Sequence, residues 1–287
     1  KSLNLSHNSI SHLVDANFDG LGSLSSLSLR YNSIKSITSA AFHHLKSLEY
    51  LSLDHNNIRE LAPRIFYKLD KLKHLDLSHN KLLLVDEEVL KDIRNIQHIS
   101  CGSCGLTNFR VGFGLRFLRV LELADNNIES LSDLEPHILR GLATLDISGN
   151  RISKVSGPEN IYINPSYKAC QHQFVAALLF IAFLSQVDKL DMMQIEVLNL
   201  SRNKIQEIEK CAFCLSTKLT HIDISQNGLL EIGNIFGGQS YDNLKYFSAS
   251  HNMVQVPVKT FPSVPKCFNK KFCFQDISKT IKKFPGQ

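Results

Sequence analysis

Tryptophan is absent from this chain, and so is any apolar run long enough to cross a membrane. The most prominent unbroken apolar run covers the eleven residues 174–184, whereas a membrane-spanning helix needs about 17 to 25. Leucine and isoleucine carry most of the apolar content. A composition of this kind predicts a repetitive aliphatic core and excludes a membrane bundle.

Sequence patterns of common active sites are also missing. The chain has no His-Glu-x-x-His, Gly-x-Ser-x-Gly or P-loop pattern, and Gly112-Phe113-Gly114 lacks the third glycine of a dinucleotide-binding loop. We therefore expect these residues to form no active site and to bind no cofactor.

Positive charge is concentrated at the C-terminal end. Residues 258–287 contain seven lysines and one aspartate, a surplus of +6, whereas the whole chain has a formal net charge of +5. The rest of the chain is therefore close to neutral. Nucleic-acid binding requires a basic patch on a folded surface, so a near-neutral body with a basic tail predicts no nucleic-acid partner.

The pattern Leu-x-Leu-x-x-Asn recurs throughout the chain. It begins at residues 3, 27, 51 and 75 with a period of 24, and it returns in varied form at residues 99, 121, 145, 198, 222 and 247. We call its last residue the ladder position. The ladder positions are Asn8, Asn32, Asn56, Asn80, Cys104, Asn126, Asn150, Asn203, Asn227 and Asn252.

The chemistry of this motif predicts a solenoid. Leucines at a period of two point to the same side of a short strand, so both should face a core. Each coil can bury them only against neighbouring coils. An amide at the ladder position can donate to and accept from backbone groups of adjacent coils. We predict parallel strands at residues 3–5, 27–29, 51–53, 75–77, 99–101, 121–123, 145–147, 198–200 and 222–224.

A second apolar set follows each ladder position, as Ile34, Ile37, Phe42 and Leu45 follow Asn32. This arrangement resembles the 24-residue form of the leucine-rich repeat family, which is typical of extracellular proteins such as Toll-like receptors, Slit-like and chaoptin-like proteins. The resemblance implies an α/β solenoid, a leucine-rich repeat horseshoe with a parallel concave β-sheet and an irregular or short-helical convex side. A spine of stacked rings is expected near the convex side, from Phe18, Phe42, Phe66, Phe213 and Phe236.

The repeats are interrupted once and stop before the C-terminus. We predict regular repeats over 1–156, a degenerate repeat or insertion over 157–193, further repeats over 194–257 and a basic non-repeat tail over 258–287. The interruption has three open interpretations: a degenerate repeat, a buried helix in an insertion, or a gene-prediction artefact. The tail contains Cys267 and Cys273, but it lacks the Asn-Pro opening of the family's cysteine cap.

Two Cys-x-x-Cys pairs, Cys101/Cys104 and Cys211/Cys214, have the spacing of zinc ligands. Cys101 takes a core position and Cys104 a ladder position, whereas the second pair brackets Phe213 on the far side of a distant coil. The two pairs cannot converge, so no metal site is expected. Because the chain has seven cysteines, at least one is free or pairs outside this sequence.

Histidine and tyrosine recur at outward positions of neighbouring coils, which lie about 4.8 Å apart in a sheet. The concave face is therefore the candidate binding surface, although Leu-Ser-His-Asn can also be read as a frequent form of the repeat. The candidate residues are Tyr31, Tyr50, His55, His74, Asp76, His79, His98 and Glu122. By contrast, His43 and His44 are expected on the convex side, in solvent.

A rigid row of outward side chains loses little conformational entropy on binding. The sequence therefore predicts a recognition module that binds a protein ligand or partner, as part of a cell-surface or secreted receptor or adhesion protein. The alternative is an intracellular scaffold or regulatory arm of a larger protein. Because residue 1 already lies within a repeat, we expect a fragment, with any membrane attachment in a segment outside it.

Overall fold

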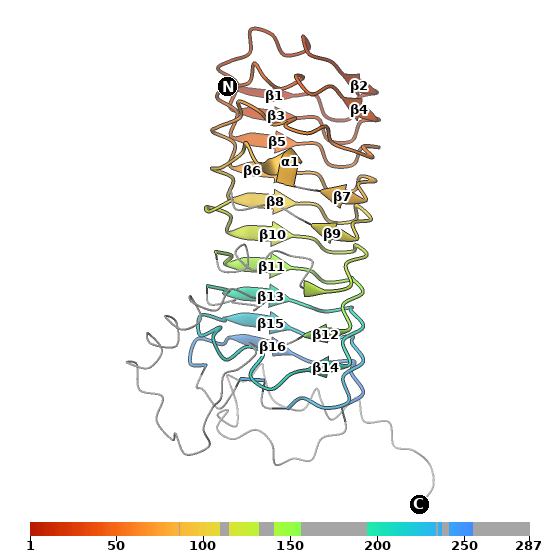
Figure 1. The fold of residues 1–287 in the computed structure, drawn as a ribbon, viewed down its shortest axis with the longest axis vertical. Coiled ribbons are helices and arrows are strands. Elements are labelled where there is room, and N and C mark those ends of the chain that lie inside the picture. Colours follow the sequence, from red (N-terminus) through yellow and green to blue (C-terminus); the bar gives the residue numbers. More distant parts are fainter. Residues whose placement is uncertain are drawn as a thin grey trace, which may run out of the picture.

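Ten parallel strands form one continuous sheet along the length of the molecule (Figure 1). The computed structural model describes residues 1–85, 87–109, 115–131, 141–155, 194–233, 235–236 and 241–254. Each strand is followed by a turn and a return segment that leads to the next strand, and we call this unit a rung. The described chain is therefore a parallel-sheet solenoid. The predicted segments 157–193 and 258–287 lie outside the described residues.

Each strand of the sheet has three residues, and the strands follow one another in space as they do in sequence. They are β1 (Ser2–Asn4), β3 (Ser26–Ser28), β5 (Tyr50–Ser52), β6 (His74–Asp76), β8 (His98–Ser100), β10 (Val120–Glu122), β11 (Thr144–Asp146), β13 (Val197–Asn199), β15 (His221–Asp223) and β16 (Tyr246–Ser248). The predicted strands are thus present, each beginning one residue earlier than the motif suggests. Pairing already includes the residue before the first leucine, as Tyr50 opposite His74 illustrates.

The return side, which runs from each ladder position to the next strand, contains little regular structure. Three pairs of two-residue parallel strands lie at the same end of the rungs (Figure 1). They are β2 (His12–Leu13) with β4 (Ser36–Ile37), β7 (Leu84–Val85) with β9 (Asn108–Phe109), and β12 (Lys154–Val155) with β14 (Glu207–Ile208). The described return segments otherwise consist mainly of turns, with one short helix, α1 (Glu87–Leu90). Among the described residues, no helix is long and apolar enough to span a membrane.

The core lies between the sheet and the return side. Leucines of the motif such as Leu53 and Leu77 are completely buried. On the return side, the Phe18 and Phe42 rings stack with centroids 6.1 Å apart, and the Phe42 and Phe66 rings follow at 6.3 Å. The expected phenylalanine spine is therefore present over these rungs. Each ring packs against the next coil, so the core is continuous but nearly one-dimensional.

The ladder positions connect neighbouring rungs through side-chain hydrogen bonds. The Asn56 amide nitrogen donates to the carbonyl of Leu29 on the preceding rung, at 3.0 Å, and to its own rung at Leu53, at 2.9 Å. Its Oδ1 accepts from the Ile34 amide at 3.0 Å. One side chain thereby satisfies buried donors and acceptors of two rungs, which an apolar residue cannot do.

The same connection crosses the interruption in the repeats. Strand β11 pairs directly with β13, with Leu145 opposite Leu198. Asn203 donates to the Ile147 carbonyl at 3.1 Å, and its Oδ1 accepts from the Ile152 amide at 3.0 Å. Because β11 and β13 are neighbours, the sheet has no place for another rung between them.

Candidate binding face

One side of the ten-stranded sheet covers the core, and the other side, which we call the open face, carries no other described element. Each rung presents four residues there: the first and third residues of the strand, and the second and third residues after it. On the β5 rung these residues are Tyr50, Ser52, Asp54 and His55. All eight candidate residues of the sequence analysis lie on the open face.

The fourth position of every rung has a left-handed backbone. His7, Tyr31, His55 and His79 have φ between 52° and 57°. This conformation is uncommon for residues other than glycine, and bulky side chains rarely adopt it. The chain needs it to turn out of the strand into the ladder position. These four residues, which we call the turn column, therefore lie in the turn after each strand and not in the strand itself. The turn fixes the direction of their rings.

The turn column forms a continuous ring stack. His7 and Tyr31 lie with their centroids 4.5 Å apart, Tyr31 and His55 follow at 4.1 Å, and His55 and His79 also lie at 4.1 Å. The Arg30 guanidinium lies over the Tyr31 ring, 4.9 Å from its centroid. Four consecutive rungs thus present one aromatic edge along the open face.

A second row of rings, the strand column, runs along the first positions of three rungs, with Tyr50 stacked on His74 and His98 tilted against His74. The rings of Tyr50 and His74 are nearly parallel, with centroids 4.4 Å apart, and His74 and His98 lie at 5.6 Å. Tyr50 is 48% exposed and Tyr31 is 37% exposed, so both columns are accessible from solvent. Burial, followed by the nearby His98 and Lys73 charges, lowers the pKa of His74.

Carboxylates lie beside both columns. Asp54 Oδ2 lies 2.9 Å from His55 Nδ1 and 3.5 Å from Arg30 Nε, while the Ser52 hydroxyl donates to its other oxygen at 2.5 Å. The sequence analysis did not select Arg30 or Asp54, although both occupy the third open-face position of their rungs. Their contacts link the β3 and β5 rungs and hold the His55 ring in place.

Glu122 closes the strand column at its C-terminal end. Its Oε2 lies 3.1 Å from His98 Nε2 and accepts from the Ser100 hydroxyl at 2.5 Å. The hydrogen bond with His98 is the main cause that lowers the pKa of the Glu122 carboxyl, which burial opposes and Ser100 supports. Asp76 lies between the two columns on the β6 rung, where its Oδ1 accepts from the Ser78 amide at 2.9 Å.

The cysteine-substituted ladder position keeps part of the ladder geometry. The Cys104 thiol donates to the Leu77 carbonyl at 3.2 Å, and the Cys104 amide donates to Asn126 Oδ1 at 3.1 Å. Asn8 bonds only within its own rung, to the carbonyls of Leu5 and Ser6. The other ladder asparagines reach the preceding rung as Asn56 does.

His43 was expected in solvent on the convex side, but its ring is partly buried on the return side. Its ring packs edge-on against Tyr67 of the next rung, with centroids 5.4 Å apart, and its buried Nε2 has no hydrogen-bond partner in the described structure. Burial accordingly lowers the pKa of His43. Only His44 lies in solvent as expected, 3.3 Å from Asp19. His43 and Tyr67 take the same repeat position on adjacent coils, directly after Phe42 and Phe66, so the spacing could have revealed this contact.

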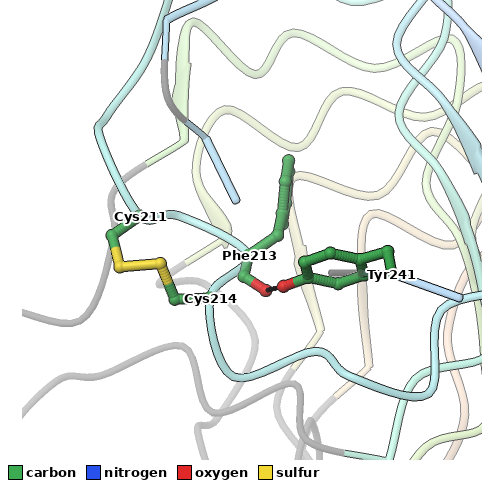
Figure 2. Close-up of a disulfide and its surroundings, with 4 residues drawn as sticks. All are labelled: Cys211, Phe213, Cys214 and Tyr241. Atoms are coloured by element: carbon green, nitrogen blue, oxygen red, sulfur yellow. Dashed lines mark hydrogen bonds between the residues drawn. A yellow bond between two sulfur atoms is a disulfide. The ribbon is translucent and has the colours of Figure 1, made fainter. Parts of the chain in front are cut away.

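The two cysteine pairs have different chemistry. Cys211 and Cys214 form a disulfide across the turn that holds Phe213, and the Tyr241 hydroxyl donates to the Phe213 carbonyl (Figure 2). The sequence analysis did not predict this bond. Cys101 and Cys104 are buried free thiols with sulfurs 2.7 Å apart, and burial raises the pKa of Cys101. No group of three or more metal-ligating side chains occurs within the described ranges.

Two family profiles match the chain. The leucine rich repeat profile matches residues 1–58 and 48–106, and a profile described as BspA type leucine rich repeat region matches residues 190–283. These matches together span more than half of the sequence, and the chain belongs to the leucine-rich repeat family. Proteins of this family generally mediate protein–protein recognition and are generally not enzymes. No curated protein matches the sequence significantly.

Solved structures share the fold at low sequence identity. A leucine-rich repeat protein of Leptospira interrogans is 21% identical with a TM-score of 0.66, and the match covers 88% of this chain and 55% of that one. An internalin of Listeria monocytogenes is 15% identical with a TM-score of 0.59, covering 88% and 68%. Toll in its glycosylated complex with Spatzle from Drosophila is 21% identical with a TM-score of 0.60, covering 93% and 34%. The chain thus spans about half of the Leptospira protein.

Proposed function

We propose that the open face is the concave inner face of a leucine-rich repeat horseshoe and that it binds a protein ligand as part of a cell-surface or secreted receptor. The contact residues are Tyr31, Tyr50, His55, His74, Asp76, His79, His98 and Glu122.

The observation that carries this proposal is the pair of ring columns on a sheet face that no described element covers. Tyrosine and histidine rings supply apolar area with a polar edge, a composition that protein interfaces favour. Stacking on neighbouring rungs holds the Tyr31 and His55 rings in place before a partner arrives. A pre-ordered surface of this kind loses little side-chain entropy on association.

Two observations support an extracellular setting. The Cys211–Cys214 disulfide belongs to the chemistry of oxidising compartments, because cytosolic thiols are kept reduced. The Toll structure that shares this fold was solved as a glycosylated complex with Spatzle. An accessible protein-binding face and a disulfide together fit a receptor ectodomain better than an intracellular scaffold.

The proposal can be tested with a panel of purified secreted and cell-surface ectodomains, screened by biolayer interferometry against the immobilised chain. Any ectodomain that binds is then measured against the triple variant H55A/H74A/H79A. The matched control is H12A/H44A, which removes exposed return-side histidines.

We expect the triple variant to weaken binding by about tenfold or more, since buried aromatic contacts commonly dominate an interface. The control should bind like the parent chain, and circular dichroism should show that both variants remain folded. Equal affinities of the triple variant and the control would place the contact surface elsewhere and overturn the proposal.

A further inference from the structure

The open face has a charge of opposite sign to the chain. Over five consecutive rungs, β5, β6, β8, β10 and β11, all twenty open-face positions are described, and they include no lysine or arginine. They carry five carboxylates, on Asp54, Asp76, Glu122, Asp125 and Asp146. The chain as a whole has a formal net charge of +5. The negative charge is therefore a property of this face.

Two of these carboxylates are well placed to meet a partner. Asp76 and Asp146 take the third position of their strands, and their Oδ1 atoms accept from the amides of Ser78 and Ser148 at 2.9 and 3.0 Å. Among the described residues, neither carboxylate forms an ion pair. By contrast, Asp54 is paired with Arg30 of the preceding rung, and Asp125 with Arg202 two rungs further on. Asp76, Glu122 and Asp146 take the same strand position, with Ser100 of the β8 rung between Asp76 and Glu122, and neighbouring rungs lie about 4.8 Å apart.

Histidines lie beside two of the five carboxylates. His55 Nδ1 lies 2.9 Å from Asp54, and His98 Nε2 lies 3.1 Å from Glu122. Asp54 is already paired with Arg30, whereas a neutral imidazole leaves the negative charge of Glu122 in place. A protonated imidazole would form an internal ion pair with an adjacent unpaired carboxylate and cancel its charge, and histidine is the side chain that changes charge in the physiological pH range.

We propose that the open face of the β5–β11 rungs binds an arginine- or lysine-rich segment of a protein at neutral pH and releases it on acidification. This inference rests on the proposed function, because it names the partner chemistry for the same face. The carboxylates supply the attraction for basic side chains, and the ring columns border them at Asp76, which lies between His74 and His79 on the β6 rung. Acidification converts this face from negative towards positive.

Other groups around the histidines act in the same direction. His74 faces Tyr50, His98 and Lys73, so a proton on His74 adds to a positive environment. His55 faces Tyr31 and His79 as well as Asp54, and Arg30 shares the Asp54 carboxylate. Protonation of stacked histidines on adjacent rungs places like charges side by side. A bound cationic segment meets growing repulsion as the pH falls.

The probe is a short fluorescein-labelled peptide of alternating arginine and serine. A peptide of alternating glutamate and serine is the control of opposite charge. Anisotropy titrations at about pH 7.5 compare the parent chain with D76N/D146N. An asparagine Oδ1 keeps the turn bond, as Asn199 does at the equivalent position of β13, where it accepts from Ser201 at 3.1 Å. The matched control is E60Q/E231Q, which removes two exposed carboxylates elsewhere.

We expect the arginine peptide to bind the parent and the control alike and D76N/D146N about fivefold more weakly, as for two exposed ion pairs. The glutamate peptide should not bind. Absence of arginine-peptide binding, equal losses in control and variant, or equal binding of the glutamate peptide would each overturn the inference.

The pH arm uses the ratio of dissociation constants at about pH 5.5 and pH 7.5 within each protein. The parent should bind about tenfold more weakly at the lower pH, and H55Q/H98Q should show a clearly smaller ratio. Gln226 already occupies the left-handed position equivalent to His55, so glutamine fits there. Equal ratios would overturn the release mechanism. An ectodomain that depends on H55A/H74A/H79A but ignores D76N/D146N and pH would leave the proposed function standing and refute only this inference.

Discussion

The rungs before the interruption and those after it share one buried framework. Asn56 and Asn227 each donate to the preceding rung at 3.0 Å, to the carbonyls of Leu29 and Leu200. Each also accepts from a backbone amide of that rung at 3.0 Å. The inward residues Leu53 and Ile224 are both completely buried. The repeated motif therefore specifies the same rung in both regions.

The outward residues differ between the two regions. Before the interruption, seven rings form two continuous rows, with neighbouring centroids no further apart than 5.6 Å. After it, the positions equivalent to the turn column hold Arg202, Gln226 and His251. At those equivalent to the strand column, the rings of His221 and Tyr246 lie with centroids 6.1 Å apart. The fold thus fixes the inward positions and leaves the outward ones free. The ring columns are not needed to build a rung, which makes them candidates for binding.

The largest expected effect concerns the shared framework. Leu53→Ala and Leu200→Ala remove equivalent leucines, both completely buried. Each should lower the free energy of unfolding by about 2–5 kcal/mol through the cavity it leaves. Urea unfolding followed by circular dichroism measures both. If one substitution is costly and the other neutral, the two regions do not share the same packing.

Substitutions at ladder positions should lower the free energy of unfolding by different amounts in the two regions. Asn56→Ala strands buried backbone groups of two rungs and should cost about 1–3 kcal/mol. Asn227→Ala should cost less, because Asn227 is only partly buried and water can reach the groups it leaves. The same urea titrations compare the two variants. Equal losses would show that burial does not set the strength of the ladder.

The Cys211–Cys214 disulfide is specific to the later region. It closes a very short loop, so its removal by Cys211→Ser and Cys214→Ser together should cost at most about 2 kcal/mol. Hydrogen exchange should accelerate around the Phe213 turn and stay unchanged on the β3–β6 rungs, since solenoid rungs interact mainly with their neighbours. Equal acceleration in both regions would contradict this local role.

The smallest expected effect on stability is the pH response of the strand column. Because the pKa of His74 is lowered in the folded protein, the unfolded chain binds the proton more readily, and stability falls as pH drops below the ordinary histidine value. His74→Gln should reduce this loss between about pH 7 and pH 5.5. Glu122 acts in a lower window, because its pKa is lowered and its contribution disappears only at more acidic pH. Thermal melts at both pH values provide the measurement.

The sequence predicts the buried part of the fold well because each inward position repeats. Nine strands, the ladder register and the spine from Phe18 to Phe66 follow from spacing alone. The strands begin one residue early since backbone pairing extends past the leucine that marks the pattern. The left-handed turn at His55 could not be predicted, because the motif records residue types and not backbone angles.

Contacts between rungs can be predicted where both residues take the same motif position. The ring columns could be anticipated, since Tyr31 and His55 occupy the same motif position on adjacent rungs. His43 and Tyr67 also occupy the same motif position on adjacent rungs, directly after Phe42 and Phe66, so the repeat spacing could have revealed their contact as well. The Cys-x-x-Cys spacing of Cys211 and Cys214 is visible in the sequence, but it was considered only as a possible zinc site and not as a disulfide.

The most direct measurement of the central claim is photo-crosslinking of a bound ectodomain through benzoylphenylalanine placed singly at Tyr31, Tyr50 and Tyr67. Tyr31 and Tyr67 are matched in exposure, at 37% and 38%, but Tyr67 lies on the return side beside His43. The account predicts crosslinks from positions 31 and 50 and none from 67. Crosslinking from position 67 alone would contradict binding through the open face.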